Sequence, residues 1–154
     1  MMNYIKWIRN KVGHKKIILN FAAACIVNNE GEILLQKRAD FKDAWGFPGG
    51  ALELGESAEE ALKREAREET GLEIKIDKLI GVYTKYFSVY PNGDEAQTVL
   101  IFFRCTPQAG HLTSQKHETL ELKYFKSDDM PPLFNKQHQD ALADFLSGRS
   151  GVFR

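Results

Sequence analysis

Alternating and periodic apolar positions divide the chain into strand-like and helix-like segments. Runs rich in β-branched and aromatic residues predict strands at 17–27, 32–38, 73–90, 98–106 and 118–126. The stretch 73–90 fits either one long strand or two short ones. Apolar positions at helical spacing predict helices at 3–12, 57–71 and 135–146. Strands interspersed with helices in this order are typical of an α/β fold, in which helices sandwich a mixed β-sheet.

Turn and cap residues mark several ends of these segments. Residues 28–31, Asn-Asn-Glu-Gly, predict a hairpin turn between the first two strands. Ser57 is a suitable N-cap for the second helix because Glu60 follows three residues later. Gly13 and Gly71 are placed to end the first and second helices.

The length of 154 residues suits one domain with a single core. We expect a basic amphipathic helix or arm at 1–16, the main domain with its C-terminal helix at 17–147, and a flexible tail at 148–154. The apolar side of the N-terminal helix is short for a helix on the surface of a monomer. A homodimer in which this helix contacts the second subunit is therefore a hypothesis.

Charge is balanced overall but unevenly placed. Lys plus Arg and Asp plus Glu both number 21, which argues against binding to duplex nucleic acid. The first 29 residues contain five basic residues and no acidic one, so this region either contacts phosphates or an acidic partner or is simply a solvated surface. Cys25 and Cys105 lie in strand-like runs, where buried reduced thiols are expected. Neither a signal peptide nor a run of about 20 apolar residues is present, which predicts a soluble, cytoplasmic protein without membrane contact.

Acidic residues crowd the segment 50–72, where like charges at helical spacing repel each other. Glu65, Glu68 and Glu69 stand at positions i, i+3 and i+4 and extend the inward apolar stripe of the helix. Unpaired carboxylates are expensive to bury, whereas a divalent cation would compensate their charge. The alternative is a solvated face with pairs such as Arg64 with Glu68. Mg²⁺ prefers oxygen ligands, which the three glutamates and a backbone carbonyl of the turn at Gly49 can supply.

The same segment resembles the Nudix box, written G-x5-E-x7-R-E-U-x-E-E-x-G-U with U aliphatic. The matching residues are Gly50, Glu56, Arg64, Glu65, Ala66, Glu68, Glu69, Gly71 and Leu72. The flanking LLQKR, WGFPGG and YPNGDEAQ are similar to bacterial MutT-like members. The resemblance implies the Nudix α/β/α sandwich with a mixed β-sheet. It also implies a Mg²⁺-dependent hydrolase, with Mn²⁺ as a substitute, that cleaves the pyrophosphate bond of a nucleoside diphosphate linked to another moiety X.

The resemblance also implies roles for individual residues. Glu65, Glu68 and Glu69 would bind the metal, with Glu56 as a direct or water-mediated ligand, and Arg64 would orient Glu65 by a charge-assisted pair. The general base would be Glu65 or Glu68, with Glu118 as a candidate from a loop. For Glu118 a solvent-facing position is the alternative.

Several residues near the box are candidates for contacts with substrate. An arginine placed like Arg38 touches phosphate in relatives, although a surface pair with Asp40 or Asp43 is equally compatible with the sequence. Phe47, Phe87 and Tyr90 could stack on a base, although core packing is the default interpretation for each aromatic side chain taken alone. Asp94 follows a turn near the expected substrate mouth, where an ordinary turn is the alternative.

The substrate stays open among three kinds of compound. These are ADP-ribose or a nucleotide sugar, an ordinary or oxidised nucleoside triphosphate, and a dinucleoside polyphosphate. The position of Tyr90, 18 residues after the box, resembles that in enzymes acting on the third kind. A catalytically silent Nudix-fold regulator that binds nucleotides is the alternative function, and the intact box argues against it. An isopentenyl diphosphate isomerase would need a catalytic cysteine, for which neither Cys25 nor Cys105 has the context.

Overall fold

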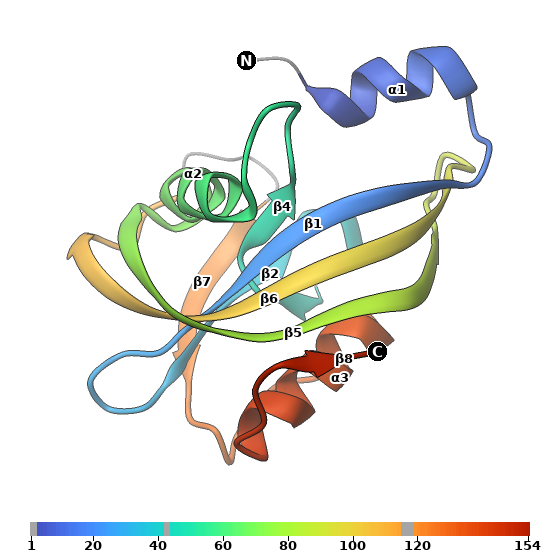
Figure 1. The fold of residues 1–154 in the computed structure, drawn as a ribbon. Coiled ribbons are helices and arrows are strands. Elements are labelled where there is room, and N and C mark those ends of the chain that lie inside the picture. Colours follow the sequence, from blue (N-terminus) through green and yellow to red (C-terminus); the bar gives the residue numbers. More distant parts are fainter. Residues whose placement is uncertain (1–2, 42–43, 115–118) are drawn as a thin grey trace.

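The structure is a computed structural model that describes residues 3–41, 44–114 and 119–154. Each strand and helix predicted from the apolar pattern is present, with ends shifted by a few residues (Figure 1). The elements in chain order are α1 (Tyr4–Val12), β1 (Ile17–Ile26), β2 (Ile33–Arg38), the 3-10 turn η1 (Ala39–Phe41), β3 (Trp45–Gly46), β4 (Gly49–Ala51), α2 (Ala58–Thr70), β5 (Leu72–Val89), β6 (Glu95–Gly110), β7 (Thr119–Phe125), α3 (Lys136–Leu146) and β8 (Val152–Phe153).

The main sheet is mixed, as expected. Its strand order is β4-β1-β6-β5-β8, in which β1 runs parallel to β6 while β4 and β5 run antiparallel to their neighbours β1 and β6. The segment 73–90 forms one long strand, β5, whose pairing with β6 is interrupted by several register shifts. A smaller antiparallel sheet has the order β3-β2-β7.

Helices cover both faces of the main sheet, which confirms the α/β/α sandwich (Figure 1). Successive side chains of β1 point to opposite faces. Ala22 and Ala24 pack in a core beneath α2 that includes Leu62. Ala23 and Cys25 pack in a second core that includes Ala141 of α3. Small side chains on β1 therefore let both helices approach the sheet closely.

The ends of α2 follow the predicted caps. The Ser57 hydroxyl accepts a hydrogen bond from the Glu60 N–H at 3.1 Å, and Gly71 adopts the left-handed conformation at φ 77°. Strand pairing at Gly71 also brings the β6 end close, so that a Cβ at this position would overlap the His111 carbonyl. Cys25 and Cys105 are buried free thiols, as predicted. Within the described ranges, no helix combines the length and apolar character that crossing a membrane requires.

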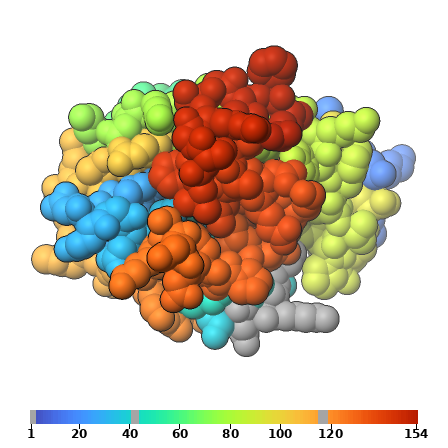
Figure 2. All heavy atoms as spheres, turned by 90° about the horizontal axis from the view of Figure 1, so that it is seen from below, coloured from blue at the N-terminus to red at the C-terminus, as the bar shows by residue number. Residues whose placement is uncertain are grey.

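Two features differ from the sequence expectation. The predicted hairpin joins its strands only at the Val27–Ile33 bridge, because β1 and β2 continue into different sheets. The segment 148–154, expected as a flexible tail, contains β8, which runs parallel to β5. Asp144 explains this order, because its buried carboxylate needs a cation and pairs with Arg154 at 3.0 Å. Figure 2 shows α3 and the C-terminal segment covering the middle of this face of the molecule.

Candidate active site

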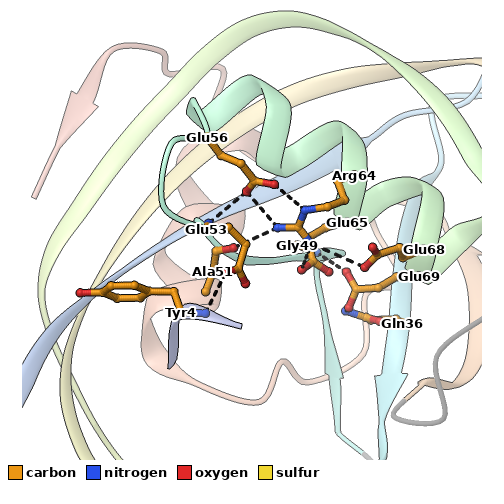
Figure 3. Close-up of polar contacts among 10 residues, drawn as sticks. All are labelled: Tyr4, Gln36, Gly49, Ala51, Glu53, Glu56, Arg64, Glu65, Glu68 and Glu69. Carbon is orange, nitrogen blue, oxygen red and sulfur yellow. Dashed lines mark hydrogen bonds and ion pairs between the residues drawn. The ribbon is translucent and has the colours of Figure 1, made fainter. Parts of the chain in front are cut away.

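The inward side of α2 carries the carboxylates predicted to lie there. Glu65 and Glu69 are each only 6% exposed and point toward the sheet (Figure 3). The Glu68 side chain, on the same helix, is more accessible to solvent, with 39% of its surface exposed. Arg67, by contrast, faces solvent and pairs with Glu73 at 2.7 Å. The acidic stripe is thus a continuation of the buried face of α2.

Arg64 connects most of these carboxylates. Its guanidinium donates to both oxygens of Glu56 at 2.6 and 3.0 Å and to Glu65 Oε1 at 2.8 Å. The Ala51 carbonyl accepts a further hydrogen bond at 3.2 Å, and Glu68 Oε2 lies 3.5 Å from Nη1. The hydrogen bonds from Arg64 hold the pKa of the Glu56 carboxyl below its usual range. Arg64 therefore contacts both Glu65 and Glu68, the two partners considered from the sequence.

Glu69 is held by a different set of donors. The Gly49 N–H donates to Oε1 at 2.8 Å, and the Gln36 amide donates to Oε2 at 2.9 Å. Gln36 is itself fixed, because its amide oxygen accepts a hydrogen bond from the Thr119 hydroxyl at 2.8 Å. Sequence reasoning missed Gln36, although a polar residue within the apolar run of β2 is a signal of a buried polar contact.

The glycines of β4 let the backbone approach these carboxylates. A Cβ at Gly50 would overlap Glu65 Oε1, and a Cβ at Gly49 would overlap the Ala22 carbonyl of β1. Only glycine therefore fits at these two positions, where β4 packs between β1 and α2.

The donor set suits a hard divalent cation. Glu65, Glu68, Glu69 and the nearby Gly49–Gly50 backbone offer the oxygen ligands that Mg²⁺ prefers. Among the described residues, no three His, Cys, Asp or Glu side chains converge closely enough to form a ready-made metal cluster. The guanidinium of Arg64 instead lies between Glu56 and Glu65. This arrangement is expected for carboxylates that pair with the nearest available cation.

A cavity of about 510 Å³ opens beside the carboxylates. That volume lies within the usual range for small-molecule sites, about 300–1,000 Å³. Gly49 and Gly50 line the cavity and also contact the carboxylates, so the two features form one continuous site. The other walls come from α1, β1, β6, the turn between β5 and β6, and α3, with further residues from the ends of β2 and β5.

Three of the residues predicted to contact substrate line this cavity as polar groups. Arg38 lines it while pairing with Asp40 at 2.9 Å, so both interpretations of Arg38 fit the structure. Tyr90 lines it as well, and burial raises the pKa of its hydroxyl. Asp94 lies on the wall, but its carboxylate is engaged by His14 at 2.7 Å.

Phe47 and Glu118 have different outcomes. Phe47 lines the cavity but is only 1% exposed, because it packs on Phe102 with ring centroids 4.6 Å apart. It therefore belongs to the core at the cavity floor, in line with the core packing that the sequence also allowed, rather than to a stacking platform. Glu118 lies outside the described residues.

His138 on α3 lines the cavity and was not predicted as a site residue. Its Nδ1 accepts a hydrogen bond from the Phe47 N–H at 3.2 Å, so the neutral ring carries its proton on Nε2. Burial lowers the pKa of His138 to about 3, and the nearby charge of Arg38 acts in the same direction. The side chain is thus a neutral hydrogen-bond donor on the wall of the site.

A consequence is a specific dependence of stability on pH. The unfolded chain binds a proton at His138 below about pH 6.5, while the folded chain does not, so acidification favours unfolding. Replacing His138 by glutamine removes this contribution. We expect the difference in unfolding free energy between native and His138→Gln protein to narrow by up to about 2 kcal/mol between pH 6.5 and 5. Urea unfolding at several pH values measures it, and parallel stability curves would contradict a neutral buried His138.

Comparisons with known proteins agree with this geometry. A family model described as the NUDIX domain matches residues 19–145. The chain is 34% identical over 131 residues to a putative 8-oxo-dGTP diphosphatase from Bacillus subtilis, with 85% of this chain and 82% of that protein covered. It is 31% identical over 128 residues to an ADP-ribose pyrophosphatase from Methanocaldococcus jannaschii, covering 82% and 72% respectively. The crystal structure of a MutT protein from Methanosarcina mazei Go1 superposes with a TM-score of 0.71 at 23% identity, covering 87% and 96% of the two chains, and shares the fold.

Proposed function

This chain belongs to the Nudix hydrolase family, and on that premise we propose that it uses Mg²⁺ to hydrolyse the pyrophosphate bond of a nucleoside diphosphate linked to a second moiety. It is a hydrolase that acts on acid anhydrides. The observation that carries the proposal is the continuity between the carboxylates of α2 and the cavity through Gly49 and Gly50.

The proposed metal ligands are Glu65, Glu68, Glu69 and the Gly49 carbonyl, with Glu56 as a direct or water-mediated ligand. A bound divalent cation would neutralise charge on the diphosphate and lower the pKa of a coordinated water. The protein prepares these ligands with Arg64 on one side and with Gln36 on the other. Oriented carboxylates reduce the reorganisation that metal and substrate binding would otherwise require.

Proton transfer from the attacking water is assigned to Glu68. Its carboxylate is the most exposed of the three on the inward face of α2, so water has access to it. The Glu65 carboxylate is buried and accepts a hydrogen bond from Arg64, which suits a ligand better than a base. Glu118 is retained as the alternative base from the loop.

The substrate is proposed to bind with its nucleoside part in the cavity and its phosphates near Gly49 and Gly50. Arg38 and Tyr90 on the cavity wall would contact the polar parts of the nucleotide. The relatives bear the names of a diphosphatase for an oxidised nucleoside triphosphate and of an ADP-ribose pyrophosphatase. Both kinds of compound, and dinucleoside polyphosphates, stay as candidate substrates.

A substrate panel tests the proposal directly. ADP-ribose, UDP-glucose, dGTP, 8-oxo-dGTP and diadenosine tetraphosphate are each incubated with the protein in Mg²⁺, in Mn²⁺ or in EDTA. We expect nucleotide release from at least one compound with Mg²⁺, retained activity with Mn²⁺, and none in EDTA. Nucleotide binding without turnover of any compound would instead favour the catalytically silent regulator. The homodimer stays a prediction, and a monomeric mass in solution at micromolar concentration would contradict it.

A further inference from the structure

Helix α1 is attached at its N-terminal end to the carboxylate site. The Tyr4 N–H donates to Glu53 Oε2 at 2.7 Å, and the Glu53 N–H donates to Glu56 Oε2 at 3.0 Å (Figure 3). Glu56 is the residue that Arg64 holds on its other side. A short series of hydrogen bonds thus runs from the start of α1 to the proposed metal ligands.

The C-terminal half of α1 is attached to the turn between β5 and β6 through Arg9. The guanidinium donates to the Glu95 carbonyl at 2.7 Å and to the Lys15 carbonyl at 2.6 Å. Asp94 Oδ2 lies 3.4 Å from Arg9 Nε. The Asp94 carboxylate also pairs with His14, just after the helix. Although α1 stands apart from the two cores, both of its ends are therefore fixed to the rest of the domain (Figure 1).

Between these attachments, Ile5 and Arg9 line the cavity. They are four residues apart and so lie on the same side of the helix. The Arg9 side chain is only 10% exposed. Within the described parts of the chain, its Nε is a buried side-chain nitrogen without a hydrogen-bond partner. The acidic group beside this Nε is the Asp94 carboxylate at 3.4 Å, so an ion pair and hydrogen bonds together hold the Arg9 side chain in place on the cavity wall.

We propose that α1 is a wall of the nucleotide cavity and that Arg9 is a specificity-determining residue that contacts an oxygen of the bound nucleotide. The proposal rests on the proposed function and extends it to a helix outside the Nudix box. The guanidinium is already oriented by three backbone carbonyls, those of Gly13, Lys15 and Glu95, so an incoming phosphate or sugar oxygen meets a fixed donor. Ile5 adds the apolar surface beside it. In this proposal the basic N-terminal segment contacts the substrate of its own domain, which is one of the roles considered for it from the sequence.

Paired substitutions on α1 test this assignment. Ile5→Trp places a large side chain in the cavity, whereas Ile8→Trp makes the same change at a position that does not line it. Arg9→Gln removes the proposed contact, whereas Lys11→Gln removes a charge that lies over Trp7. We expect Ile5→Trp and Arg9→Gln to raise KM about tenfold or more with kcat changed less than about threefold. The two controls should match the native protein.

Two further measurements distinguish the possible failures. Calorimetric binding of AMP and of adenosine identifies the oxygen that is contacted: a loss confined to AMP in Arg9→Gln indicates phosphate, and an equal loss for both indicates the sugar. Binding of AMP without turnover of any substrate overturns the proposed function but still tests α1. The Ile5→Trp variant retains the contacts of Arg9, so its result does not depend on whether Arg9→Gln detaches the helix. Unchanged KM and AMP affinity in Ile5→Trp therefore overturn the inference about α1. A native protein with neither turnover nor AMP binding overturns both proposals.

Discussion

Replacing Glu65 by glutamine is expected to lower kcat/KM by at least about a hundredfold while the protein stays folded. The substitution keeps the size of the side chain but removes the charge that would bind a divalent cation. It also replaces one of the two carboxylates to which Arg64 donates its short hydrogen bonds. Because Glu65 lies against Gly50 at the point where the carboxylates meet the cavity, the loss should fall on the reacting diphosphate.

Glu60→Gln is the matched control for this substitution. Glu60 lies in the first turn of the same helix but is exposed, so the charge change is the same without any change at the site. Steady-state kinetics with Mg²⁺, together with titration of Mn²⁺ followed by electron paramagnetic resonance, should separate the two variants. Weakened Mn²⁺ binding is expected only in Glu65→Gln. Near-native activity and Mn²⁺ affinity in that variant would remove Glu65 from the metal site.

The fold was accessible from sequence because its local signals agree with one another. Ser57 and Gly71 carry the side chain and the backbone freedom that the two ends of α2 require. What the sequence did not reveal depends on contacts between distant segments. The attachment of β8 depends on Arg154 meeting Asp144 of α3, and neither residue has a pattern that indicates its partner. Similarly, no local signal shows that β1 and β2 separate into different sheets after the turn between them.

The residues of the candidate site likewise fall into those that local sequence patterns indicate and those that depend on contacts between distant segments. The carboxylates of α2 were predictable because helical spacing alone places Glu65 and Glu69 on the inward face. Gln36, His138 and Arg9 reach the site from other elements, and only the folded chain brings them there. The distinction has a chemical counterpart. The carboxylates of α2 are proposed to act on the diphosphate, while the cavity walls that would select the nucleotide combine predicted residues such as Arg38 and Tyr90 with others that the sequence did not indicate.

Helix α2 also shows why its acidic face is tolerated in a folded protein. Carboxylates on a buried face destabilise a fold unless donors or cations compensate them. Arg64 supplies that compensation for Glu56 and Glu65, while the Gly49 N–H and the Gln36 amide supply it for Glu69. Glu68 is the member left more exposed. The site is thus partly preorganised by hydrogen bonds that also maintain the fold.

Replacing Arg64 by methionine should therefore reduce both activity and stability. We expect a loss of about 10- to 100-fold in kcat/KM, because Glu56 and Glu65 lose the donor that orients them. We also expect a loss of about 3 kcal/mol in unfolding free energy when no divalent cation is present, because two poorly exposed carboxylates are left without their partner. Kinetics and urea unfolding in EDTA and in Mg²⁺ measure the two effects.

The metal dependence of that stability loss is the sharper part of the prediction. A cation bound by the same carboxylates would replace part of the missing positive charge, so Mg²⁺ should stabilise Arg64→Met more than it stabilises the native protein. Arg67→Met is the matched control, because Arg67 lies on the same helix but pairs with Glu73 at the surface. It should leave activity and the response to Mg²⁺ unchanged. If Mg²⁺ stabilises Arg64→Met and Arg67→Met equally, the carboxylates around Arg64 are not the cation site, and the residues that position the diphosphate must be sought elsewhere along the cavity.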